Sequence, residues 1–189
     1  MVHSSASAQP IRRLTAGLSR LASAERYLFT PDDLRALVVE LSDRAFRTLL
    51  SRAASQGVLV RICRGLYLYP PALPSHGLLL YHAAARLRAD EFTYISLETA
   101  LSDVGIISQV PINWITVMSS GRSNQISCAE WGTIEFVHTR QRPEALADQL
   151  SYDARCRLWR ARPQLALRDM RVGRRSLDLI DWSVAGEFV

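Results

Sequence analysis

Residues 42–69 read SDRAFRTLLSRAASQGVLVRICRGLYLY, and this stretch decides the fold because it holds a two-faced helix and a β-hairpin in succession. Its first apolar residues recur at i, i+3, i+4 and i+7, the spacing of a buried helix face: Phe46, Leu49, Leu50 and Ala53. Ser42 or Asp43 can cap the helix, and Gly57 is a typical stop signal. The pattern therefore predicts a helix from about residue 43 to residue 56.

The opposite face of this helix is cationic. It carries only arginines and hydroxyl side chains: Arg44, Arg47, Thr48, Ser51, Arg52 and Ser55. A helix face that meets only solvent usually mixes both signs of charge. The absence of acidic residues therefore favours a surface for nucleic acid.

A β-hairpin is predicted directly after this helix. Residues 58–62 and 66–69 are rich in β-branched and aromatic side chains, and a short turn ending in Gly65 separates them. Two prolines close the second run. Arg61 and Arg64 are the cations of this hairpin.

Two more helices are predicted upstream. Apolar residues at helical spacing indicate one over residues 11–22, and Thr30-Pro31-Asp32-Asp33 is typical of the start of another, whose buried stripe would run to Leu41. A short apolar bridge, residues 27–29, connects them. Three helices followed by a hairpin is the order of a winged helix-turn-helix, whose third helix enters the major groove while the hairpin approaches phosphates or the minor groove.

Net charge supports this interpretation. The chain has a formal charge of +5, and residues 1–70 hold ten arginines against five acids, whereas residues 71–189 hold thirteen of each. The chain has no lysine, so every cation is a guanidinium, which suits phosphates and guanine edges. We therefore predict that double-stranded DNA is contacted by Arg44, Arg47, Thr48, Ser51, Arg52, Arg61 and Arg64. A small helical domain with a solvated basic face, or a winged helix that binds protein, is the alternative.

The proline-rich stretch 70–74 predicts a boundary between a domain of residues 1–70 and one of residues 71–189. The second is predicted to be a mixed α/β domain with a small sheet, which makes the whole fold α+β. Its predicted strands cover residues 92–95, 114–118 and 133–138. Its predicted helices cover residues 75–89 (capped by Ser75), 97–104, a segment from Pro143 to a break at Pro163, and 164–170.

A second basic segment lies in this domain, because residues 140–175 hold ten arginines against four acids. We predict a possible second basic surface formed by Arg155, Arg157, Arg160, Arg168, Arg171, Arg174 and Arg175. It could bind RNA, DNA or an acidic protein, or it could be a solvated exterior. Trp159 and Trp182 are expected to lie in the core.

Other function classes find no support in the sequence. No apolar run approaches the roughly 18–20 residues that cross a bilayer, and the first ten residues lack the order of a signal peptide, so we expect a cytoplasmic protein. The three cysteines (Cys63, Cys128 and Cys156) form no CxxC pair and the histidines no metal-ligand spacing. No common catalytic motif occurs, and residues 119–122, which superficially resemble an anion-binding loop, are expected to form a hairpin turn. We predict no enzyme, metal, cofactor or small-molecule substrate.

Several short motifs resemble those of AbiEi-type antitoxins. Residues 64–67 (RGLY) are similar to the family's RG-[LVI]-Y signature at the wing, and residues 94–101 (YISLETAL), followed by Gly105-Ile106-Ile107, resemble its Y-x-S-x-x-[ST]-A-L and G-L-I segments. Residues 143–148 (PEALAD) resemble its P-E-[RK]-A-L-x-D stretch with one residue missing. The likeness spans most of residues 10–150, and the arginine-rich end after Tyr152 matches no part of it.

The resemblance implies a cytoplasmic antitoxin with two roles in a phage-defence system. Its winged helix would bind repeats in its own promoter and repress the operon, and its C-terminal domain would counteract a nucleotidyltransferase-like toxin without requiring a stable complex. The alternatives are a stand-alone winged-helix transcriptional regulator and a protein-interaction module that binds an acidic partner through the 155–175 region. An RNA-processing enzyme is the least favoured hypothesis.

Overall fold

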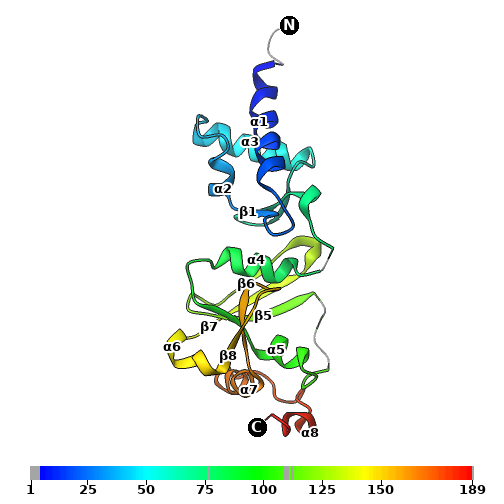
Figure 1. Ribbon diagram of the computed structural model, residues 1–189, viewed down its shortest axis with the longest axis vertical. Coiled ribbons are helices and arrows are strands. Elements are labelled where there is room, and N and C mark those ends of the chain that lie inside the picture. The colour runs from blue at the N-terminus through cyan, green and yellow to red at the C-terminus, as the bar shows by residue number, and fades with distance from the viewer. Residues whose placement is uncertain (1–4, 76, 109–110, 112, 189) are drawn as a thin grey trace. The chain divides into compact units, whose positions relative to one another are not determined.

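The computed structural model describes residues 5–75, 77–108, 111 and 113–188. Contacts divide the chain into two compact units, Met1–Gly77 and Leu78–Val189, here called the N-terminal and C-terminal units. The described residues contain eight α-helices and two sheets, which confirms the predicted α+β class (Figure 1). That residues 1–70 and 71–189 are independent domains stays a prediction. No helix in the described part of the chain is long and apolar enough to cross a membrane.

The N-terminal unit has the predicted order of three helices and a hairpin. Its elements are α1 (Ser5–Leu21), β1 (Leu28–Phe29), α2 (Pro31–Arg35), α3 (Asp43–Ser55), β2 (Val60–Cys63), β3 (Leu66–Leu68) and the short 3₁₀ helix η1 (Pro70–Ala72). The hairpin gains a third strand, since the apolar bridge forms β1 and pairs antiparallel with β3, Leu28 opposite Leu68. The sheet order is β1-β3-β2.

The core of this unit forms because each helix buries one apolar face against the others. Leu14 and Leu18 of α1 and Ala53 of α3 are completely buried, and so is Leu59, which precedes β2. Phe46 of α3 is 7% exposed in the same cluster. The spacing-based prediction of which face of α3 is buried is therefore confirmed.

The second predicted helix is shorter than expected. Thr30 caps α2 through a capping box, in which its hydroxyl accepts the Asp33 N–H (3.3 Å) while its own N–H donates to the Asp33 carboxylate (2.7 Å). The helix ends at Arg35, and the chain continues in tight turns with i→i−3 hydrogen bonds up to Leu41. Val38 is nonetheless completely buried, because successive turns of this kind also return side chains to one side. The apolar spacing therefore predicted correctly which side of this segment is buried, but it predicted too long a helix.

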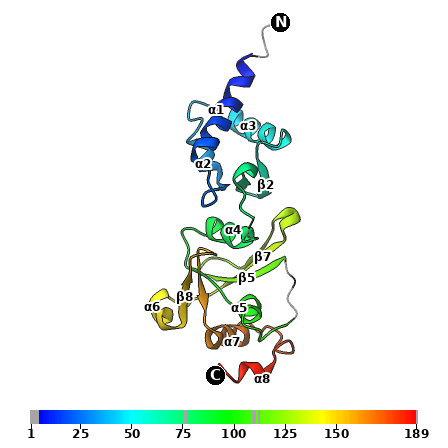
Figure 2. The same cartoon turned by 45° about the vertical axis from the view of Figure 1, so that its right-hand side comes forward.

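The C-terminal unit is built on a six-stranded mixed sheet of order β6-β7-β5-β4-β9-β8. The strands are β4 (Thr93–Ile95), β5 (Trp114–Ser119), β6 (Asn124–Ser127), β7 (Thr133–His138), β8 (Leu150–Asp153) and β9 (Leu158–Ala161). The helices are α4 (Leu79–Leu87), α5 (Leu97–Asp103), α6 (Pro143–Leu146), α7 (Pro163–Val172) and α8 (Trp182–Ala185), with 3₁₀ turns η2 (Ala129–Trp131) and η3 (Ala147–Gln149). Within this unit, α4 lies on one face of the sheet and α5 and α7 on the other (Figures 1 and 2).

Two helix predictions in this unit are wrong. The segment from Pro143 to Pro163 is not one helix: α6 spans four residues, and a β8–β9 hairpin follows it. The hairpin turn forms because the Asp153 carboxylate accepts the backbone N–H groups of Arg155 (3.0 Å) and Cys156 (3.2 Å). The helix predicted from Ser75 begins instead at Leu79, and Leu78 at its N-cap makes no side-chain capping bond. The residues between include position 76, which lies outside the described residues.

The remaining helix and strand predictions for this unit hold to within two residues. β4, β5, β7, α5 and α7 lie where expected, whereas β6 was missed because its polar residues lie on an exposed edge strand. The two tryptophans expected in the core are not buried: Trp159 is 44% and Trp182 is 51% exposed.

Candidate nucleic-acid interface

The position of α3 is fixed at both ends by local interactions. The Ser42 hydroxyl accepts the N–H of Ala45 (3.3 Å), and Gly57, with φ +71°, ends the helix in the left-handed region that favours glycine. In the first turn, Asp43 pairs with Arg35 (2.9 Å), whose guanidinium also lies 5.0 Å from the centre of the Phe46 ring. The acidic residue of α3 is thus turned toward a neighbouring cation.

The residues predicted to contact DNA all lie at the surface of the N-terminal unit. Five lie on the exposed face of α3, and two lie on the hairpin: Arg44, Arg47, Thr48, Ser51 and Arg52, then Arg61 and Arg64. Thr48 donates a hydrogen bond to the Arg44 carbonyl (3.0 Å), which leaves its hydroxyl oxygen on the helix surface. The structure therefore presents the predicted cations on one helix and the adjoining hairpin.

Two hollows flank α3. One, of about 400 Å³, lies between α3 and α1 and is lined by Arg44, Thr48 and Arg52 together with Pro10 and Leu41. The other, of about 310 Å³, lies between α3 and the hairpin and is lined chiefly by Arg47, Ser51, Arg61 and Tyr67. The exposed face of α3 is consequently a ridge with cations on both flanks.

Most carboxylates of this unit pair with arginines that are not in the predicted interface. Three of its five acidic residues form ion pairs with arginines outside the predicted interface: Arg13–Glu40 (2.8 Å), Arg26–Asp33 (3.6 Å) and Arg35–Asp43 (2.9 Å). Among the residues that the structure describes, no ion pair involves Arg44, Arg47, Arg61 or Arg64. The positive charge of the ridge and hairpin is therefore not cancelled by these acids.

The hairpin tip is a two-residue turn, Arg64–Gly65. Gly65 has φ +83°, a conformation that glycine adopts at low cost. A bulge between Arg61 and Cys63 shifts the register, and the Arg61 Nε donates to the Cys63 carbonyl at 3.4 Å. Both hairpin cations remain exposed.

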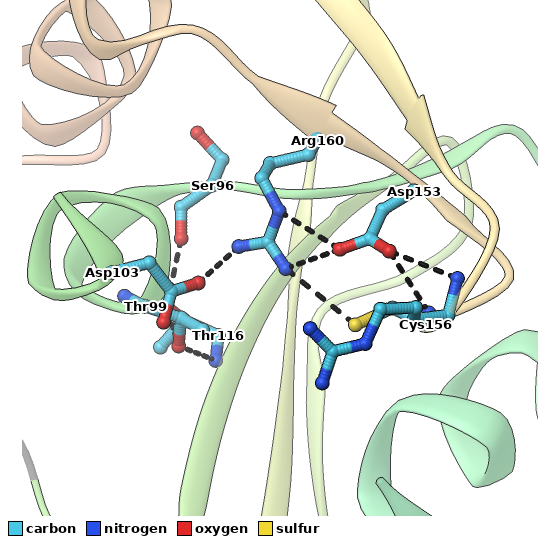
Figure 3. Close-up of polar contacts among 8 residues, drawn as sticks. Ser96, Thr99, Asp103, Thr116, Asp153, Cys156 and Arg160 are labelled. Atoms are coloured by element: carbon cyan, nitrogen blue, oxygen red, sulfur yellow. Dashed lines mark hydrogen bonds and ion pairs between the residues drawn. The ribbon is translucent and has the colours of Figure 1, made fainter.

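The arginines of the predicted second basic surface fall into three groups. Arg160 pairs with Asp103 and with Asp153 (2.8 Å), and Arg175 pairs with Glu98 (2.5 Å) and Glu135 (2.8 Å), so both connect segments of the C-terminal unit (Figure 3 shows Arg160). Arg157 and Arg168 are half-buried, and three residues are exposed: Arg155, Arg171 and Arg174. Part of the predicted basic surface, Arg160 and Arg175, therefore forms ion pairs that hold segments of the C-terminal unit together.

The Asp153–Arg160 pair shifts the acidity of its carboxyl group. Burial favours the neutral acid, but hydrogen bonds from Arg160 and from the Cys156 N–H outweigh it and lower the pKa of Asp153 to about 2. Burial together with the neighbouring Asp153 raises the pKa of the Cys156 thiol to about 11. Cys156 is 3% exposed, so it is an inert core thiol.

A buried polar network uses the residues of the 94–101 motif. The Tyr94 hydroxyl (3.0 Å) and the Ser96 hydroxyl (2.7 Å) both donate to the Asp169 carboxylate on α7. Thr99 and Thr116 bond each other's backbone N–H groups, which joins α5 to β5 (Figure 3). Sequence reasoning missed this role, although hydroxyl side chains within an apolar strand are a signal for such a network.

Residues 119–122 do not form the expected hairpin turn, because Ser119 ends β5 and the chain continues to β6, which β7 separates from β5 in the sheet. Ser119 contacts a carboxylate of the chain itself. The Ser119 hydroxyl donates to Glu91 (2.8 Å), which also pairs with Arg88 (2.5 Å). Despite burial, these partners lower the pKa of Glu91. No group of three or more potential metal ligands occurs among the described residues, and the three cysteines, all of them described, are buried and form no disulfide.

Three helices and a three-stranded wing define a winged helix, a class in which DNA-binding regulators are common. Residues 18–70 match the family model described as "Transcriptional regulator, AbiEi antitoxin". The resemblance to AbiEi antitoxins is therefore confirmed over the segment that contains α2, α3 and the hairpin. This family is one of DNA-binding transcriptional regulators and not a class of enzymes.

One solved structure supports the fold of a longer stretch. The crystal structure of the RV2827C protein from Mycobacterium tuberculosis aligns with a TM-score of 0.57 and 18% identity, covering 90% of this chain and 64% of that one. At this identity the likeness concerns the fold alone, and the chain spans less than two thirds of that protein's length. No curated protein matches the sequence.

Proposed function

We propose that this protein is a DNA-binding antitoxin that represses its own operon through the N-terminal unit and counteracts a nucleotidyltransferase-like toxin through the C-terminal unit. The observation that carries the DNA-binding part is the exposed ridge of α3, flanked by arginine-lined hollows and followed by a cationic hairpin. The family match over residues 18–70 supports the regulatory role.

The two flanks of α3 suit a ridge lying in the major groove. Arg47 and Ser51 share a hollow with Arg61, so this side offers a cation on the helix and another on the hairpin. An arginine reads guanine through its O6 and N7 atoms, whereas arginines that meet phosphates set the register without reading sequence. We assign base contact first to Arg47 and Ser51, and phosphate contact to Arg61 and Arg64.

The toxin and the operator follow from the family resemblance. The proposed operator is a set of repeats in the protein's own promoter, and the proposed partner is a nucleotidyltransferase-like toxin encoded beside it in the cytoplasm. Antagonism in this family needs no stable complex, so the two proteins are not expected to copurify.

The decisive variant is Arg47→Ala, measured by fluorescence anisotropy with a duplex from the region upstream of the gene. Losing a base-reading arginine should weaken binding about tenfold or more, with the largest loss at one base position. Arg20→Ala is the matched control, because Arg20 is an exposed arginine of α1 outside the ridge. Both variants should fold, since both side chains lie at the surface.

Unchanged affinity of the Arg47→Ala protein would contradict the assignment of α3 as the recognition helix. If the wild-type protein binds no upstream duplex and instead copurifies with a neighbour-encoded protein, a protein-interaction module becomes the better description. Specific binding without any neighbouring toxin gene would indicate a stand-alone regulator.

A further inference from the structure

Two aromatic side chains lie side by side at one edge of the six-stranded sheet. Tyr152 of β8 is directly opposite Trp159 of β9, and their ring centres are 5.4 Å apart at an interplanar angle of 68°. Directly opposed residues of neighbouring strands share a face. Both rings are open to solvent, Tyr152 at 56% and Trp159 at 44% exposure.

The position of the two rings in the sheet explains why they are exposed. Tyr94 of β4 lies opposite Trp159 on the other side, so three aromatic residues form a row across three adjacent strands. Tyr94 is completely buried and bonds Asp169 of α7, whereas exposure rises outward along the row to Tyr152. The covering helix thus protects the inner end of the row and leaves its outer end as an apolar patch.

The chain segment that carries this patch is rich in arginine. Residues 150–175 hold eight arginines and two acids. Both acids are engaged within the unit, since Asp153 pairs with Arg160 and Asp169 accepts the Tyr94 and Ser96 hydroxyls. Arg155 in the hairpin turn and Arg162 just after β9 are exposed, so cations lie beyond both ends of Trp159's strand, which spans about 13 Å at roughly 3.3 Å per residue.

We infer that the β8–β9 hairpin is a platform on which bases of a single-stranded nucleic acid stack, with Arg155 and Arg162 holding its phosphates. Base stacking on aromatic rings tolerates any sequence, and flanking cations supply the affinity for the backbone. A duplex keeps its bases stacked on one another, so the platform selects single strands. This surface belongs to the C-terminal unit and is distinct from the duplex-binding ridge of α3.

The test uses the full-length protein and fluorescein-labelled 12-mers of oligo(dT) and oligo(U), read by anisotropy. In the variant Tyr152→Leu/Trp159→Leu the patch stays apolar but loses its aromatic faces, so binding should weaken about tenfold or more. Trp182→Leu is the matched control, because Trp182 is 51% exposed on α8 and outside the row. The two oligonucleotides distinguish a DNA from an RNA ligand.

A second readout is direct. Oligonucleotide binding should quench the tryptophan fluorescence of the wild-type protein, and Trp159→Leu should remove most of that quenching while Trp182→Leu keeps it. The Arg47→Ala protein should lose duplex affinity and keep single-strand affinity, which separates failure of this inference from failure of the proposed repressor function.

Three results would overturn the inference. The double variant could bind single strands as tightly as the wild type, Trp182→Leu could lose as much affinity, or Arg47→Ala could abolish single-strand binding and so assign it to α3. A wild-type protein that binds neither oligonucleotide would overturn it as well, because the patch would then not be a stacking platform.

Discussion

Single positions in this chain tolerate no larger side chain, and Gly132 is the clearest of them. It adopts φ +120° between η2 and β7, and a Cβ built there would lie 2.0 Å from the carbonyl oxygen of Asn113. A backbone atom cannot move aside as the end of a flexible side chain can. Gly132 therefore fixes the approach of Asn113 to the start of β7, where the Thr133 N–H donates to the same carbonyl (2.8 Å).

The substitution Gly132→Ala should destabilise the protein by about 2–4 kcal/mol, because positive-φ strain adds to a backbone clash. Gly57→Ala is the matched control: Gly57 has φ +71° but no atom within 4 Å of the added Cβ, so it should lose only about 1 kcal/mol. Urea unfolding of both variants measures the difference. Equal losses would show that the clash at position 132 is relieved.

Asp153 gives the chain a pH-dependent stabilisation. Its pKa of about 2 in the folded protein lies below the value near 3.9 of an unfolded aspartate, so its contribution is full above about pH 5 and disappears as the pH falls toward 2. Asp153→Asn should therefore cost about 1–2 kcal/mol at pH 7 and progressively less below pH 4. Unfolding free energies of the variant and the wild type across this range test the prediction. A difference that does not depend on pH would contradict it.

At the scale of elements, α3 is the part of the protein whose formation is most local. Its cap, its buried face and its glycine stop all lie within residues 42–57. The β8–β9 hairpin is the opposite case, because Leu146, Leu150 and Leu158 are spaced as on one helix but are buried in three different elements, α6, β8 and β9. Their spacing fits either structure, and pairing of β9 with the distant strand β4 selects the hairpin.

Removing the α3 cap should loosen this proposed recognition helix without changing its cationic face. Ser42→Ala should cost about 1 kcal/mol, since the Ala45 N–H loses its side-chain acceptor. Ser42→Asp should retain most of the stability, because aspartate caps as well as serine does. Thermal unfolding (Tm) of the two variants measures this, and an equal drop in both would show that the hydroxyl has another role.

At the scale of the whole molecule, the two units use their charged side chains differently. In the N-terminal unit, three of the five acidic residues pair with arginines outside the predicted interface, Arg13, Arg26 and Arg35. The C-terminal unit uses Arg160 and Arg175 to join segments far apart in sequence. A uniform count of arginines cannot distinguish these uses, because an internal ion pair and an exposed guanidinium have the same formal charge.

The proposed phosphate contacts predict a salt dependence of duplex binding. The logarithm of the association constant should fall linearly with the logarithm of salt concentration, by about 0.9 for each phosphate neutralised. Arg64→Ala at the hairpin tip should weaken all duplex sequences alike and make the slope shallower by about 1. Anisotropy titrations at several salt concentrations test this, with Arg20→Ala expected to keep the wild-type slope. An unchanged slope for Arg64→Ala would remove the hairpin tip from the interface.

The amino-acid sequence by itself determined the winged helix, the buried and exposed faces of α3 and the family resemblance, because capping residues, apolar spacing and turn glycines act between neighbours a few positions apart. Tertiary structure alone decided that residues 150–161 form a hairpin, that the Asp169 carboxylate accepts hydrogen bonds from Tyr94 and Ser96, and that Trp159 remains open to solvent. These outcomes depend on partners far away in the chain: Arg160 meets Asp103 across 57 positions and Arg175 meets Glu135 across 40. Local spacing contains no information about such partners, since only the packed sheet and its covering helices bring them within reach.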